Sequence, residues 1–172
     1  MLDRFFKRKP AVSGVSILLL QREIDRFSDE RLNAAMQRGW RRPYDPKTFY
    51  AVSLNGEGAV FKAVGAYFTM QHFEHRITSK QLGDQELPIW AIHNAHSVLE
   101  YKCPGGVPEG TMRDRMYAFL GLLCAELVSP KTTAVLFSEE HVLLRNTPSL
   151  VKLLRSGGDI NPTNLMSNPS LI

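Results

Sequence analysis

TMRDRMYAFLGLLCAELVS, residues 111–129, is the stretch that decides the fold. Its apolar side chains recur every three to four residues, which predicts a long amphipathic helix with one side in a core. The predicted core side comprises Met112, Met116, Phe119, Leu120, Leu123 and Leu127. Thr111 is expected to be the N-cap, with Asp114 three residues later in a variant of the capping box, and Pro130 to mark the stop.

Strands are predicted before this helix at 15–20, 48–54, 59–73 and 95–101. The first does not alternate between apolar and polar residues, which is typical of a strand buried on both faces. The third is either continuous or interrupted at Gly65. A helix capped by Ser28 and closing at Gly39 follows the first strand. The glycines of Asn55-Gly56-Glu57-Gly58 predict a tight hairpin, because glycine accepts positive φ angles.

The segments around and after the long helix are less regular. Residues 76–86 are polar and loop-like, and 87–94 fit neither helix nor strand clearly, although Pro88 suits a first helical turn. A fifth strand is predicted at 132–137, a short helix at 139–144, and a helix opened by Thr147 and Pro148 that runs to Arg155. The resulting expectation is an α+β protein, a ferredoxin-like βαββ(α)β sandwich extended by the long helix, a fifth strand and C-terminal helices.

Three regions are expected: a basic tail over 1–14, a single α+β domain over 15–156, and a flexible tail over 157–172. The sheet face opposite the helices is expected to be apolar, so a second copy of the chain, giving a homodimer, is the predicted cover. Another protein is the alternative partner.

Charge and cysteine content exclude several classes of protein. The net charge is +4, but four basic residues lie in the first nine positions, so the rest is close to neutral and no nucleic-acid partner is expected. The apolar run 11–20 is far shorter than the roughly 20 residues of a membrane span, and no small-residue cleavage site follows it. Cys103 and Cys124 form no disulfide framework, which favours a cytoplasmic protein with reduced thiols.

Histidines form the one cluster of residues with chemical potential: His72, His75, His93 and His96. Imidazole is a common zinc ligand, so a zinc site is one hypothesis. Residues three apart on a strand point to opposite faces, however, and HExxH is absent, so the expectation is no cofactor and a polar, hydrogen-bonding role. A hydrolase using one of these histidines with Ser97 or Cys103 is the related alternative.

The loop KCPGGVPEG, residues 102–110, is the second candidate site. It is long, contains two prolines, and is fixed at both ends by regular structure, which is typical of recognition loops. A plain strand-to-helix connection is the alternative. The candidate recognition residues are Cys103, Pro104, Gly105, Gly106, Pro108 and Glu109.

LPIWAIHNAHSVLEYKC at 87–103, the loop, the long helix and TTAVLFSEEHVLL at 132–144 together resemble a bacterial family of unknown function with an α+β, ferredoxin-like fold. The resemblance covers roughly residues 15–155 and rests on hydrophobic patterns. It implies a fold, but no activity and no functional residue.

The sequence therefore predicts a non-catalytic α+β module that acts through homodimerisation or protein–protein binding. The alternative is a small metal-dependent or histidine-dependent hydrolase whose site is built from His72, His75, His93 and His96.

Overall fold

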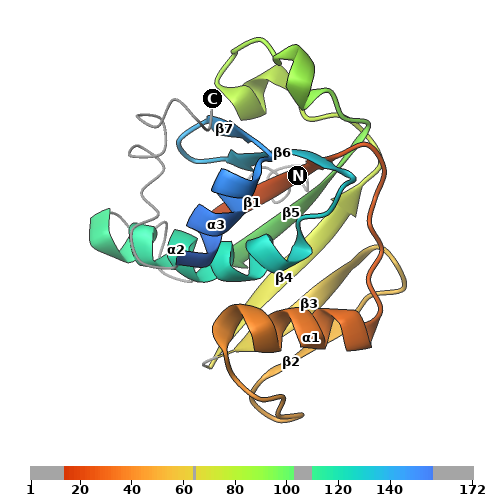
Figure 1. Cartoon of the computed structure of the whole chain (residues 1–172), viewed down its shortest axis with the longest axis vertical. Coiled ribbons are helices and arrows are strands. Elements are labelled where there is room, and N and C mark those ends of the chain that lie inside the picture. Colours follow the sequence, from red (N-terminus) through yellow and green to blue (C-terminus); the bar gives the residue numbers. More distant parts are fainter. Residues whose placement is uncertain (1–13, 64, 103–109, 157–172) are drawn as a thin grey trace, which may run out of the picture.

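The computed structural model describes residues 14–63, 65–102 and 110–156 (Figure 1). Within them lie three α-helices, α1 (Asp29–Trp40), α2 (Gly110–Leu127) and α3 (Pro148–Ser156), and two single turns of 3₁₀-helix, η1 (Ser79–Leu82) and η2 (Ile89–Ala91). The strands are β1 (Gly14–Gln21), β2 (Tyr50–Ser53), β3 (Gly58–Ala63), β4 (Ala66–Phe73), β5 (Ala95–Lys102), β6 (Thr132–Phe137) and β7 (Val142–Arg145). The predicted α+β class is confirmed.

All seven described strands form one antiparallel sheet in the order β2-β3-β4-β5-β1-β6-β7. β1 lies inside the sheet, where Ile17 is opposite Leu99 of β5 and Phe137 of β6. β2 is an edge strand, separated from β1 by β3, β4 and β5. This order differs from the four-strand arrangement predicted from the sequence, so the ferredoxin-like topology is not established by it.

Local signals account for the first half of the chain well. Ser28 is the N-cap of α1, and its Oγ accepts a hydrogen bond from the backbone N–H of Arg31 at 3.3 Å. The hairpin at 55–58 is confirmed: Asn55 and Gly56 have φ of 49° and 83°, as a tight two-residue turn requires. The predicted strand 59–73 is interrupted at Gly65, and its two parts, β3 and β4, pair with each other.

Two predictions around α2 and β6 are wrong. α2 begins at Gly110, so Thr111 lies inside the helix and is not its N-cap. Residues 139–144 do not form a helix, because His141 at φ 55° turns the chain back and Val142–Arg145 pairs with β6 as β7. The opening of α3 is confirmed, since the backbone N–H of Leu150 donates to Thr147 Oγ1 at 3.3 Å.

The main core lies between the sheet and the helices, which pack on one face of it (Figure 1). β1 is buried on both faces, as predicted. The α2 prediction is confirmed for the buried Leu120, Leu123 and Leu127 but is wrong for Met112, which is exposed. The buried side of α2 also includes Tyr117 and Cys124, so it is rotated away from Met112.

A second, smaller core covers part of the opposite sheet face. The segment 74–94, which connects β4 to β5 and is green in Figure 1, carries Leu82 and Ala91 against Leu18, Leu20 and Leu136 of β1 and β6. A second copy of the chain was the predicted cover for this sheet face. Over β1 and β6, the segment 74–94 of the same chain covers it instead. Over β2, β3 and β4 the same face carries exposed or half-buried side chains instead: Tyr50, Val52, Val60, Lys62, Tyr67, Thr69 and Gln71.

Candidate functional site

The four candidate histidines lie where β4 and β5 meet the segment between them. His75 and His96 contact each other, with ring centroids 5.1 Å apart, and His96 Nδ1 donates to the carbonyl oxygen of His75 at 2.9 Å. His93 Nδ1 donates to Ala91 O, while His93 Nε2 accepts the backbone N–H of Ile77 at 3.0 Å. These hydrogen bonds attach the segment to the sheet.

Burial lowers the pKa of His93, and likewise of His72 and His96, so the three rings are uncharged at neutral pH. Both nitrogens of His93 are already occupied by backbone groups. Within the described residues, no group of three or more His, Cys, Asp or Glu side chains is placed to hold a metal ion.

His72 and Ser97 do meet, with Nδ1 and Oγ 2.8 Å apart, as a histidine-dependent nucleophile would require. Ser97 is buried, however, and its hydroxyl donates to Gln21 Oε1 at 2.7 Å. A serine hydroxyl has only one hydrogen, and here that hydrogen is donated to Gln21. His72 Nδ1 must therefore be the donor to Ser97 Oγ, so the ring does not accept the serine proton through this contact. The chain of hydrogen bonds from His72 through Ser97 to Gln21 joins β4, β5 and β1 on the sheet face that carries the main core.

Cys103, Pro104, Gly105, Gly106, Pro108 and Glu109 of the candidate recognition loop lie outside the described residues. The other cysteine, Cys124, is a free thiol, and burial raises its pKa to about 12. A thiol in that state is not a nucleophile at neutral pH.

A surface that sequence reasoning missed is formed by η2 and the neighbouring strand ends. Ile89 is 83% exposed and Ile92 is 48% exposed, on either side of the buried Ala91. Pro88 opens the turn at φ −65°, and the backbone N–H of Ala91 donates to Pro88 O at 2.9 Å. The tight turn thus buries Ala91 against the sheet while its isoleucine neighbours face solvent.

Two arginines border these apolar residues. Arg22 and Arg145 line, together with Ile89, Trp90 and Ile92, a pocket of about 480 Å³. Among the described residues neither guanidinium has an ion pair or a side-chain hydrogen bond. We call Ile89, Trp90, Ile92, Arg22 and Arg145 the η2 patch. The sequence signal was the apolar run IWAI, which has neither helical nor strand periodicity.

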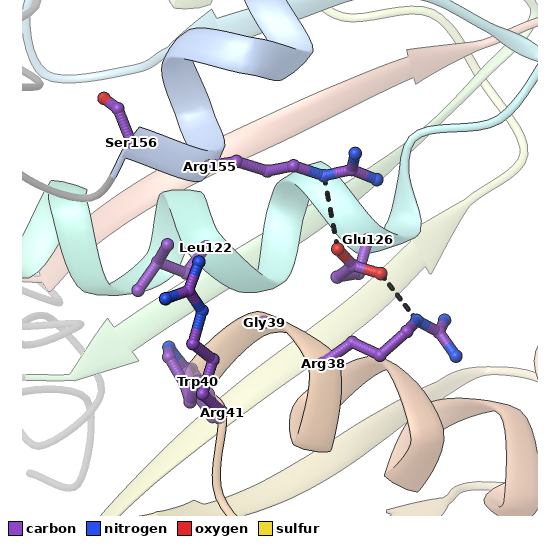
Figure 2. A pocket seen from close by; sticks show the side chains of 8 residues that line it. All are labelled: Arg38, Gly39, Trp40, Arg41, Leu122, Glu126, Arg155 and Ser156. Atoms are coloured by element: carbon purple, nitrogen blue, oxygen red, sulfur yellow. Dashed lines mark hydrogen bonds and ion pairs between the residues drawn. The ribbon is translucent and has the colours of Figure 1, made fainter.

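A different kind of pocket lies at the ends of α1 and α3, beside α2 (Figure 2). Its volume is about 410 Å³, and Glu126 on α2 forms ion pairs there with Arg38 of α1 and Arg155 of α3. A third pocket, of about 180 Å³, is apolar and lies between the sheet and α2, next to Phe68, Tyr101 and Phe119. That volume is below the several hundred Å³ typical of small-molecule sites.

None of the described helices is long and apolar enough to cross a membrane. In the comparisons with known proteins, the chain matches no family model, no curated protein and no solved structure.

Proposed function

We propose that this protein is a non-catalytic α+β module that acts by binding another protein through the η2 patch. The observation that carries the proposal is the 83% exposure of Ile89, which lines one pocket with Trp90 and two arginines. Neither arginine has an acidic partner among the described residues. Exposed apolar side chains that gather in one patch rimmed by polar residues are typical of protein–protein interaction sites.

The composition of the patch favours a protein as its partner. Tryptophan and arginine are the residues most enriched among those that dominate binding energy at protein interfaces. Covering an exposed isoleucine side chain completely contributes about 1.5–3 kcal/mol. Arg22 and Arg145 would select a partner that carries carboxylates next to its apolar residues, because leaving either guanidinium buried and unpaired would be costly.

Self-association is the other form of the same proposal, in which the partner is a second copy of the chain. The expected homodimer through the sheet would use the face over β2, β3 and β4, where Val52 and Tyr67 are exposed. Lys62 lies over the rings of Tyr50 and Tyr67 there, with its Nζ 6.0 Å and 5.4 Å from their centroids. A charge at the centre of that face makes it a weaker candidate than the η2 patch.

The fold proposal is an elaborated ferredoxin-like sandwich. Two observations support it. Four strands lie side by side in the sheet in the order β4-β5-β1-β6. Without β2 and β3, the chain runs through these strands and two helices in the ferredoxin-like order β1-α1-β4-β5-α2-β6. β2, β3 and β7 are then additions at the two edges. Membership of the resembled bacterial family and a cytoplasmic location, which the free thiol of Cys124 supports, belong to the same proposal.

The test is affinity capture from the native host with the intact chain, quantified by mass spectrometry, for wild type, Ile89→Asp and Arg145→Gln. Met112→Asp is the matched control, because Met112 is also exposed but lies on α2. A protein that is captured by wild type and by the control, but by neither patch variant, is then purified. Its affinity for wild type and for each variant is measured by calorimetry. We expect Ile89→Asp to weaken binding at least tenfold, which corresponds to about 1.4 kcal/mol.

Sedimentation velocity of the same variants decides whether the partner is a second copy. A wild-type dimer that becomes monomeric with Ile89→Asp identifies self-association through the patch. A partner lost with Met112→Asp instead, or captured equally by every variant, rejects the η2 patch as the binding surface.

A further inference from the structure

The pocket at the ends of α1 and α3 contains three arginines and one glutamate. Arg38 and Arg41 come from the end of α1 and the residue after it, Arg155 from the last turn of α3, and Glu126 from α2. Three guanidinium groups and one carboxylate leave a local charge of +2. This concentration of positive charge lies on the helical side of the molecule, on the other sheet face from the η2 patch.

Glu126 forms ion pairs with two of the three guanidinium groups. Its side chain is only 10% exposed, and its two oxygens lie 2.8 Å from Arg38 Nε and 3.3 Å from Arg155 Nε. Both contacts use the Nε atom, so among the described residues the terminal amino groups of each arginine have no partner. Figure 2 shows Glu126 between the two arginines, whose terminal nitrogens extend beyond it. Such paired, pre-oriented donors suit the oxygens of an anion.

Arg41 has a backbone conformation that is unfavourable for arginine. It caps the C-terminus of α1 in the left-handed region, with φ 51° and ψ 44°, a position at which glycine is the usual residue. Its side chain lines the pocket, and none of the described residues pairs with it. An arginine kept at a strained position without a structural partner points to a role for its charge.

The charge balance favours an anion with two negative charges. α1 and α3 both end at this pocket, and the C-terminus of a helix carries a partial negative charge of about half an elementary charge. The two helix ends therefore cancel part of the +2. In the positive field that remains, a phosphate dianion gains about twice the electrostatic energy of a single carboxylate.

The apolar part of the pocket has room for more than the anion. The ring of Trp40 is stacked on Phe119, with centroids 4.3 Å apart, and its indole N–H donates to Phe119 O at 2.8 Å, so the ring is fixed in place. Leu122 and Gly39 complete this side of the pocket. We propose that Arg38 and Arg155, oriented by Glu126, form together with Arg41 a binding site for the phosphate group of a small organic phosphate.

The test follows the indole N–H signals of the two tryptophans by NMR during titration with adenosine monophosphate at constant ionic strength. Trp40 lies in this pocket and Trp90 in the η2 patch, so each signal reports one site. We expect a saturable shift of the Trp40 signal and none of the Trp90 signal. Arg41→Gln is expected to weaken binding about tenfold, the usual effect of losing one charge-assisted hydrogen bond. Lys80→Gln, at an exposed position of η1 outside both sites, should leave binding unchanged.

Arg41→Gly separates binding from folding. Glycine is favoured in the left-handed conformation, so this variant should unfold at a higher denaturant concentration than wild type while binding the nucleotide about tenfold more weakly. A variant that is more stable and binds equally well would overturn the proposal. So would a shift of both tryptophan signals together, which would show non-specific attraction to positive charge.

Two further probes identify the source of the phosphate. Inorganic phosphate should shift the Trp40 signal at higher concentration than adenosine monophosphate does, because it makes no contact with the apolar side of the pocket. The protein should not co-sediment with vesicles that contain phosphatidate. Sedimentation with these vesicles that depends on Arg41, without binding of the soluble nucleotide, would overturn the assignment to a small organic phosphate.

Discussion

At the scale of single residues, Gly39 sets how closely α1 approaches α2. A Cβ atom at this position would lie 2.8 Å from the backbone oxygen of Leu122 and 3.2 Å from its carbonyl carbon. Real Cβ atoms do not approach backbone atoms so closely, and a backbone neighbour cannot rotate away as a side chain can. The absent side chain therefore fixes the spacing of the two helices, and with it the position of Arg38 relative to Glu126.

We predict that Gly39→Ala destabilises the protein by about 1–2 kcal/mol, because the overpacking cost exceeds the roughly 1 kcal/mol that alanine contributes in a helix. The measurement is the free energy of unfolding from urea titration, with Gln37→Ala on the exposed side of α1 as a control expected to be nearly neutral. In an isolated helix the same substitution increases stability. An increase in the protein would contradict the prediction and show that a methyl group fits between α1 and α2.

Residue types also explain which features the sequence revealed. Ser28, Asn55 and Gly56 act through their own backbone and immediate neighbours, so their roles follow from local chemistry. The contact between His72 and Ser97 depends on the register of β4 against β5, which places these residues opposite each other. No spacing rule within the chain contains that information. The same is true of Arg22 and Arg145, which come together only because β1 and β7 both flank β6.

At the scale of elements, the segment 74–94 is the part that sequence reasoning described least well. The sequence predicts loop and ambiguous structure there, yet the segment contributes Leu82 and Ala91 to a core of its own. Its apolar residues are few and irregularly spaced, because 3₁₀ turns present only one or two side chains each to the sheet. The sequence does not predict β7 for a related reason: four residues are too few to display a period of two clearly.

The same segment should make the protein sensitive to mild acid. Burial is the main cause that lowers the pKa of both His93 and His96, whereas in the unfolded chain their pKa is about 6.5. Below that pH the unfolded state binds protons that the folded state does not, so stability is full above about pH 6.5 and falls as the pH decreases. Protonation of His93 Nε2 also removes the acceptor for the N–H of Ile77.

We therefore predict that the urea midpoint of unfolding falls between pH 7 and pH 5, and that His93→Gln reduces the slope of this fall. The slope is compared between wild type and variant, because Glu139, whose pKa is raised chiefly by partial desolvation, titrates in the opposite sense in both. His141→Gln is the control, since His141 is exposed and lies in the β6–β7 turn. An unchanged slope for His93→Gln would mean that protons taken up elsewhere control the acid sensitivity.

At the scale of the whole molecule, the sheet is covered unequally. On one face the helical core extends from β2 to β7. On the other face the segment 74–94 covers β1 and β6, and Val98 of β5 packs against the same cluster, while β2 and β3 are left open. Among the described strands, only β1 shows in its sequence that both of its faces are covered, because its apolar run is uninterrupted. The extent of the second cover depends on the path of a long connection, which composition does not determine.

This asymmetry predicts an order of local stability. β1 has hydrogen-bonded neighbours on both sides and a core on both faces, so its amides should exchange with solvent only when the whole protein unfolds. β2 is a four-residue edge strand with one neighbour, and the exposed Val52 alternates with the buried Ala51. Its amides should exchange through opening of the β2–β3 hairpin while the rest of the sheet stays folded.

Native-state hydrogen exchange in low concentrations of denaturant measures both openings. For β1 the opening free energy should equal the global free energy of unfolding and fall with denaturant at the same slope, because the same surface is exposed. For β2 it should be lower by at least about 1–2 kcal/mol and nearly independent of denaturant, since a small opening exposes little surface. Equal values and slopes for the two strands would show that the edge hairpin and the covered centre unfold as one unit, and that the second core does not create a separate, more stable part of the sheet.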